Sequence, residues 1–393
     1  MKKALVYFTV FNPALGGGEF TPLAFVSALQ KKGCDVTLAL DWHSDTARAA
    51  EKLGLAIDMA KLKVAYVKPR GGLARHIDSI IPVFRTRALK KLARDADICI
   101  STANPVDFGK PGHHFVYLLR TFGDNAFLER ISGAARRNDR APLARRLRTF
   151  VAEALLRPLL GVRSTRKILA DRRERIYPTS LYVERTMRDF YGDFNSRVFY
   201  PPTVFVPSGR PDAARDPLKT IYIGQIFPQK RLHDIIDIVE LARKLTGKDL
   251  TLAIAGNMRP DSYTGRLRKM AGTRPWVSFA GMLYGREKEA FLLSGTYALH
   301  AERDEAFGIS ITEYLKSGAI PVVPDEGGTA EIVDDPDLSF GDNARAAEIL
   351  AGLVEDANLR REKQLRCAAR ARRWTLEAYL ANQEEILEDI LQS

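Results

Sequence analysis

Cysteine and long apolar runs are both scarce in this chain. The three cysteines among its 393 residues, Cys34, Cys99 and Cys367, lie far apart, which excludes a metal-binding spacing and a disulfide framework. No apolar run approaches the roughly 18 residues that a membrane-spanning helix needs. The opening M-K-K-A-L-V-Y-F resembles a short secretion signal, but no small-residue cleavage site follows it. We therefore expect a cytoplasmic protein with reduced thiols.

Residue patterns for metal or nucleophilic chemistry are also missing. An Asp-x-Asp triplet, Asp95 to Asp97, lies where a helical pattern gives way to a strand, and carboxylates at such junctions usually serve as caps and aid solubility. No nucleophile with a neighbouring base pair of His and Asp stands out. The sequence therefore predicts no metal and no cofactor.

Positive charge is concentrated in one segment. The formal net charge is +12, and residues 130–175 contain fourteen Lys or Arg against four acidic residues. Apolar residues recur there at three- and four-residue steps from Leu143 to Leu159, which predicts a basic amphipathic helix. Two interpretations stay open: a solvated helix that packs on its own domain, or a face for anionic lipid headgroups or a lipid-linked acceptor. Phe150 is the one aromatic residue of the segment, so we do not expect nucleic acid as a partner.

Short apolar runs alternate with helical patterns in two series, one from residue 4 to about 119 and one from about 218 to 324. Runs that are apolar on both faces and separated by helices indicate parallel sheets covered on both sides. We therefore predict an α/β protein with two doubly wound, Rossmann-like domains that face a central cleft. The expected boundaries are 1–203 for the first domain, 204–370 for the second, and 371–393 for a last helix that returns to the first domain.

The stretch E-A-F-G-I-S-I-T-E at residues 305–313 is the most informative motif. The apolar spacing after Phe307 predicts a helix that begins near Gly308, so the first backbone N–H groups lack partners within the helix. Such a helix start attracts phosphate. Glu305 would precede the helix and Glu313 would lie about a turn and a half inside it, so that a carboxylate could reach each side of a bound anion.

Four elements together resemble a known family. They are G-G-G-E at Gly16 to Glu19, G-Q-I-F-P-Q-K at Gly224 to Lys230, F-A-G at Phe279 to Gly281, and the E-x7-E stretch. In order and spacing they are similar to those of retaining glycosyltransferases of the GT-B architecture, as in glycosyltransferase family 4. The resemblance covers nearly the whole chain and implies a hexosyltransferase that uses a UDP- or GDP-linked sugar and no metal.

The resemblance also implies roles for individual residues. Lys230 would neutralise the donor diphosphate and Glu305 would hold the transferred hexose, and both are the predicted catalytic residues. Glu313 would accept hydrogen bonds from the ribose. The other predicted donor-binding residues are Gly16, Gly17, Gln225, Arg231, Gly256, Asn257, Ala280, Met282, Phe307, Gly308 and Ile309. On the acceptor side we expect Glu19, Arg120 and Asp124. His300 would contact the sugar or form a buried hydrogen bond.

One residue departs from the family pattern. Gln225 stands five residues before Lys230, where family members commonly carry Arg. Arg231 or a residue of the first domain would then supply the missing charge. The G-Q-x-x-P-x-K form resembles the branch that adds mannose to lipid-linked oligosaccharides, which favours a lipid-linked or cell-envelope glycan as acceptor and a location on the inner face of the membrane.

Other classes of function remain open. A nicotinamide-dependent oxidoreductase would explain the glycine-rich first turn, but the G-x-G-x-x-G pattern fails at Thr21. A nucleotide-sugar epimerase, or a binding protein for nucleotide sugars or polyanions, could use the same fold. The sugar, the nucleobase, the acceptor and the oligomeric state cannot be deduced from the sequence.

Overall fold

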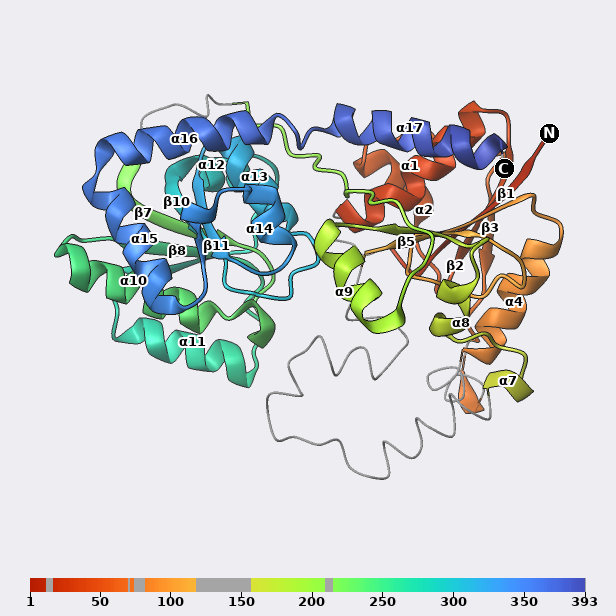
Figure 1. Ribbon diagram of the computed structural model, residues 1–393, viewed down its shortest axis with the longest axis horizontal. Coiled ribbons are helices and arrows are strands. Elements are labelled where there is room, and N and C mark those ends of the chain that lie inside the picture. Colours follow the sequence, from red (N-terminus) through yellow and green to blue (C-terminus); the bar gives the residue numbers. More distant parts are fainter. Residues whose placement is uncertain (12–16, 70, 74–81, 118–156, 209–214, 393) are drawn as a thin grey trace. The chain divides into compact units, whose positions relative to one another are not determined.

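The computed structural model describes residues 1–11, 17–69, 71–73, 82–117, 157–208 and 215–392. Its contacts divide the chain into two units (Figure 1). The first unit comprises Met1–Pro202 and Tyr379–Ser393, and the second comprises Thr203–Ala378. The division thus falls between Pro202 and Thr203, and most of the last helix, α17, belongs to the first unit.

The first unit is built on a parallel six-stranded sheet in the order β3-β2-β1-β4-β5-β6. The central strands are almost fully buried apolar runs, as expected for a sheet with helices on both faces. The chain leaves β1 toward β2 and β3 on one side, and continues from β4 on the other side. The strands are β1 (Lys3–Phe8), β2 (Asp35–Leu40), β3 (Lys63–Tyr66), β4 (Ile98–Ser101), β5 (His113–Val116) and β6 (Arg175–Pro178).

Helices of the first unit follow these strands in the chain. Ser180 caps the helix after β6, because its side chain accepts a hydrogen bond from the Val183 N–H at 3.1 Å. The helices are α1 (Gly17–Lys31), α2 (Thr46–Lys52), α4 (Val83–Arg94), α7 (Arg157–Leu159), α8 (Thr165–Ala170), α9 (Leu181–Tyr191) and α17 (Leu376–Gln392). Arg197 holds α17 in this unit through Glu385 at 2.7 Å.

One carboxylate of the Asp95–Asp97 triplet bonds to the backbone of a strand, whereas the sequence predicted that the triplet caps a helix. The triplet lies between the end of α4 and the start of β4. The Asp97 carboxylate accepts a hydrogen bond from the Lys3 N–H at 2.8 Å. This carboxylate therefore satisfies the backbone at the start of β1.

His113, at the start of β5, gives the first unit a dependence on pH. Burial, together with the charges of His114 and Arg175, lowers the pKa of His113 to about 4. The unfolded chain takes up this proton near pH 6.5, so the unfolding free energy should fall as pH decreases from about 6.5 to about 4. The side chain in His113→Gln cannot be protonated at these pH values. We predict that, between pH 7 and pH 4.5, the unfolding free energy of the wild type falls by up to about 2 kcal/mol more than that of this variant. Urea denaturation at both pH values measures this difference, and equal losses in the two proteins would contradict it.

The second unit has a parallel six-stranded sheet in the order β12-β11-β10-β7-β8-β9. The chain runs from β7 outward to β9, then crosses back to β10 on the other side of β7. β7 and β10 are parallel neighbours, but after β7 the chain continues to one side of the sheet and after β10 to the other side. The topological switch point of this sheet therefore lies between these two strands. The strands are β7 (Asp216–Ile223), β8 (Thr251–Ala255), β9 (Val277–Gly281), β10 (Gly295–Leu299), β11 (Ile320–Pro324) and β12 (Ser339–Phe340).

Helices cover both faces of the second sheet (Figure 1). Helix α13 is fixed to β7 because the Tyr314 hydroxyl accepts a hydrogen bond from the Ile223 N–H at 2.7 Å. Lys316, also on α13, donates to the carbonyls of Thr203 and Phe205 at 2.8 and 2.9 Å. The helical segments are η3 (Pro228–Lys230), α10 (Leu232–Thr246), α11 (Ser262–Gly272), α12 (Gly285–Ser294), α13 (Ile309–Ser317), α14 (Gly328–Val333), η4 (Pro336–Leu338), α15 (Asn343–Glu355) and α16 (Ala357–Ala371).

The two sheets confirm the predicted α/β class with two Rossmann-like halves. Two short strands, β6 and β12, were not predicted. Among the described residues, no helix is both long and apolar enough to span a bilayer.

Candidate functional site

The switch point of the second sheet brings together residues that are about 75 positions apart in the sequence. Lys230 ends η3, which follows β7, and Glu302 and Glu305 lie on the loop that follows β10. Since β7 and β10 are parallel neighbours, the loops at their carboxyl ends meet at the same edge of the sheet. The sheet order therefore places an ammonium group beside two carboxylates.

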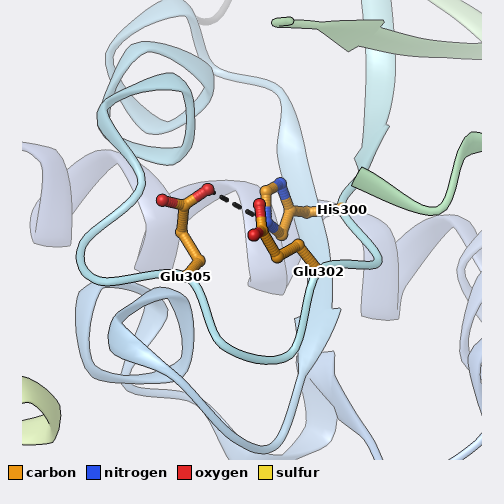
Figure 2. A group of neighbouring side chains, drawn as sticks. All are labelled: His300, Glu302 and Glu305. Carbon is orange, nitrogen blue, oxygen red and sulfur yellow. Dashed lines mark ion pairs between the residues drawn. The ribbon is translucent and has the colours of Figure 1, made fainter. Parts of the chain in front are cut away.

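One ammonium group is shared by the two carboxylates. Lys230 Nζ lies 2.6 Å from Glu302 Oε2 and also donates to Glu305 Oε2. His300, at the end of β10, completes the group, and its Nε2 lies 3.7 Å from Glu305 Oε2. Figure 2 shows His300, Glu302 and Glu305 with their polar ends turned toward one another. We call these four residues the lysine–carboxylate cluster.

Burial and charge set the protonation states of the cluster. Burial opposes a charged Lys230, but the negative charges of Glu305 and Glu302 outweigh it and raise the pKa of Lys230. Burial would likewise raise the pKa of Glu305, yet the charge of Lys230 holds this pKa below its usual range. For His300, burial and then the Lys230 charge lower the pKa to about 4. At neutral pH the cluster therefore contains one cation, ionised Glu305 and a neutral imidazole.

For His300 the sequence left two expectations open, contact with the sugar or a hydrogen bond in the protein interior. Its side chain is 1% exposed, and neither ring nitrogen makes a hydrogen bond within the described part of the chain. The alternative of a hydrogen-bonded buried histidine is therefore wrong for the described residues. Contact with the sugar remains a prediction.

The predicted helix start beside Glu305 is present. Helix α13 begins at Ile309, and Gly308 precedes it with φ of 100°, a left-handed conformation that favours glycine. A Cβ at Gly308 would also lie 2.8 Å from Thr329 Cγ2. Phe307 is 4% exposed and packs on the ring of Trp374 with the centroids 5.4 Å apart. These contacts thus fix the short loop between Glu305 and the first amides of α13.

Glu313, the second carboxylate of the motif, has a cation of its own. Its Oε1 accepts a hydrogen bond from Lys288 Nζ on α12 at 2.6 Å. Glu313 is 7% exposed. The two glutamates of E-x7-E are therefore each paired with a different lysine, Glu305 with Lys230 and Glu313 with Lys288.

The remaining predicted donor-side residues of the second unit lie at the ends of β7, β8 and β9. Gln225 is exposed directly after β7. The Arg231 guanidinium pairs with Asp234 at 2.5 Å, so its charge is already compensated. A Cβ on Gly256 would lie 2.1 Å from the carbonyl oxygen of Gly224, so a side chain there would push the two loops apart. Asn257 follows Gly256, and Ala280 and Met282 are exposed at the end of β9.

Predicted residues of the first unit are only partly described. Gly17 opens α1 and Glu19 lies in its first turn, after β1. Gly16, Arg120 and Asp124 lie outside the described residues. Their predicted roles toward donor and acceptor remain predictions.

The basic segment 130–175 is described only from residue 157. Several of its cations there have acidic partners: Arg163 contacts Asp107 and Glu174 at 2.9 and 2.8 Å, and Arg173 contacts Asp171 at 2.9 Å. These arginines contribute less to an open basic face than the sequence suggested. The predicted amphipathic helix from Leu143 lies mostly outside the described residues.

Within the part of the chain that the structure describes, one group of side chains is spaced to hold a metal ion. It consists of His300, Glu302 and Glu305, whose ligand atoms lie within 4.8 Å of one another. Lys230 makes ion pairs with both carboxylates of this group, so an ammonium supplies the positive charge that a metal would bring. The absence of a metal stays a prediction.

Sequence reasoning missed three contributors to the site: Glu302, Lys288 and the Gly327–Gly328 pair. Glu302 lies three residues after β10, but no motif in the sequence includes it. Lys288 had no signal, because its pairing depends on how α12 packs beside α13. The Gly328 N–H donates to the Glu305 carbonyl at 2.8 Å, and this support also depends on tertiary contacts.

Comparison with known protein families gives a match over most of the second unit. Residues 209–374 match the model of a family described as glycosyl transferases group 1. No curated protein sequence matches the chain significantly.

Solved structures with the same fold cover nearly the whole chain. One is HepE from Anabaena in complex with UDP and glucose, with 14% identity, 99% and 100% coverage of this chain and that chain, and a TM-score of 0.65. WaaG, a glycosyltransferase involved in lipopolysaccharide biosynthesis, has 15% identity, coverage of 98% and 99%, and a TM-score of 0.66. Sucrose-phosphate synthase from Thermosynechococcus elongatus has 13% identity, full coverage of both chains and a TM-score of 0.66. The matched domain and the shared fold together make this chain a glycosyltransferase of the GT-B fold.

Proposed function

We propose that this chain is a retaining, metal-independent hexosyltransferase that moves a hexose from a UDP- or GDP-linked sugar to an acceptor hydroxyl. The observation that carries the proposal is the pairing of Lys230 with Glu302 and Glu305 at the switch point, directly before the start of α13. Complexes of HepE with UDP and with UDP-glucose support a nucleotide-sugar donor.

The site suits the departure of a nucleoside diphosphate. Negative charge grows on the phosphate as the bond to the sugar breaks, and Lys230 with the first amides of α13 would stabilise it. Glu305 would accept hydrogen bonds from hexose hydroxyls, and Glu313 would accept them from the ribose. Gly16 and Gly17 would let backbone approach the diphosphate. A metal is not needed in this scheme, because Lys230 and the helix start supply the positive potential.

We propose that configuration is retained, as the family resemblance implies, and the lowered basicity of Glu305 supports a route in which Glu305 takes no proton. A carboxylate whose pKa is lowered, as for Glu305, is a weak proton acceptor. In a front-face attack the leaving phosphate itself would take the proton of the acceptor hydroxyl. Glu305 would then orient the sugar without forming a covalent intermediate.

For the acceptor we propose a lipid-linked or cell-envelope glycan, with the enzyme on the inner face of the membrane. The likeness to WaaG and the positive charge of residues 130–175 support this class. Anionic headgroups would attract such a segment by about 1 kcal/mol per exposed Lys or Arg.

Binding of the donor can be tested without knowing the acceptor. We predict that one member of a panel of UDP- and GDP-sugars raises the thermal unfolding temperature, because a ligand at 100 times its Kd adds about 2.7 kcal/mol to the stability of the folded state. Differential scanning fluorimetry with and without EDTA measures the shift. A stabilisation that disappears with EDTA would contradict metal independence, and no shift with any donor would contradict the proposal.

Turnover separates the remaining alternatives. A transferase should release nucleoside diphosphate slowly from its donor by hydrolysis, and rapidly once an acceptor is present. An epimerase would convert the donor without releasing the diphosphate, and a binding protein would do neither. Proton NMR of the product gives the anomeric configuration, and an inverted product would exclude the retaining mechanism.

A further inference from the structure

Glu302 is placed differently from Glu305, although both carboxylates pair with Lys230. Glu302 is the more deeply buried of the two, with 5% of its side chain exposed against 19% for Glu305. It lies three residues nearer to the buried strand β10. Of the two carboxylates, Glu305 is therefore the one placed to reach a substrate. Glu302 pairs with Lys230 on its buried side.

Sharing of Lys230 creates a competition. An ammonium has three N–H donors, and in the structure it donates to Glu305 and forms an ion pair with Glu302 at 2.6 Å. A diphosphate that binds Lys230 must take over some of these donors against two negative charges. Repulsion between nearby negative charges is strong at a site of low dielectric constant, so the two carboxylates should weaken binding of the diphosphate. His300 does not relieve this repulsion, because its ring is neutral at pH 7.

We propose that Glu302 is a positioning residue that competes with the diphosphate for Lys230 and thereby promotes release of the nucleoside diphosphate product. The proposal rests on the proposed function. While the donor is bound, the sugar hydroxyls satisfy Glu305 and Lys230 turns to the diphosphate. After transfer the sugar has left, so Glu305 and Glu302 together draw Lys230 back and the diphosphate is released.

The charge of Glu302 is the part that matters, so the test keeps its shape. Glu302→Gln retains the length of the side chain and a polar oxygen, but removes the negative charge that pairs with Lys230. We expect this variant to bind UDP or GDP roughly tenfold more tightly than the wild type. Isothermal titration calorimetry measures Kd, and stopped-flow displacement of a fluorescent N-methylanthraniloyl derivative of the same nucleotide measures a slower dissociation.

Two further variants separate charge from structure. Glu302→Asp keeps the charge and should bind the nucleotide as the wild type does. Glu240→Gln, on α10, removes a charge that pairs with Arg274 at 2.9 Å, and should also leave Kd unchanged. Weaker nucleotide binding by both Glu302 variants would mean a merely structural role and would overturn the proposal.

The same titrations distinguish failure of the proposed function from failure of the proposed role of Glu302. If the wild type binds neither UDP nor GDP, the proposed function fails and Glu302 loses its role with it. If the wild type binds one of them and Glu302→Gln binds it equally or more weakly, only the role of Glu302 is refuted.

Discussion

Glu305→Gln is expected to lower the rate of sugar transfer by about 100- to 1000-fold, the usual cost of removing one preorganised polar group from an active site. The neutral amide keeps the volume of the side chain, but loses the charge that pairs with Lys230 and that would orient hexose hydroxyls in the proposed scheme. Lys230 retains Glu302 at 2.6 Å, so no buried cation is left alone. The unfolding free energy should therefore change by no more than about 1–2 kcal/mol. Transfer or donor hydrolysis, measured as released nucleoside diphosphate, gives the rate.

The second glutamate of the motif serves as the matched comparison. Glu313→Gln alters a carboxylate that pairs with Lys288, and in the proposed scheme this carboxylate contacts the ribose. It should raise KM for the donor more than it lowers kcat. Full activity of Glu305→Gln would remove that residue from the site. Alanine at Lys230 would be a poorer test, because it would leave Glu302 and Glu305 buried without their cation.

The sheets were largely predictable because their strands are apolar on both faces. β11, for example, is fully buried along its whole length and contains only apolar residues. The missed strands carry weaker signals: β6 is four residues long and begins with an exposed arginine, and β12 has only two residues. Such short edge strands are defined by pairing with a neighbour, which a local pattern does not reveal.

The site was predicted in part for the same reason. The helix start at Gly308 follows from local apolar spacing and was found. The contact between Lys230 and Glu305 depends on β7 and β10 being neighbours; the family resemblance implied only that both residues bind the donor. Glu302 could be found neither from local apolar spacing nor from the family resemblance. Its importance appears only when its distance to Lys230 is known.

Gly328→Ala is expected to have the second large effect, although residue 328 carries no functional group. A Cβ at this position would lie 2.4 Å from the Ala306 carbonyl oxygen and 2.8 Å from Phe307 Cα. Both are backbone atoms of the loop that carries Glu305, so the loop must shift. We predict a loss of roughly 3 kcal/mol in unfolding free energy and at least about 100-fold in transfer rate, since a displacement near 1 Å of a catalytic group can cost that much.

Gly265 on α11 is the matched control for this substitution. A Cβ there meets nothing within 4 Å, so Gly265→Ala should leave the transfer rate unchanged and raise stability by up to about 1 kcal/mol, as alanine does within a helix. Urea denaturation and the nucleotide-release assay on both variants make the comparison. If Gly328→Ala were as stable and as active as Gly265→Ala, the loop would not be held by close backbone contact. The position of Glu305 relative to Lys230 would then need another cause.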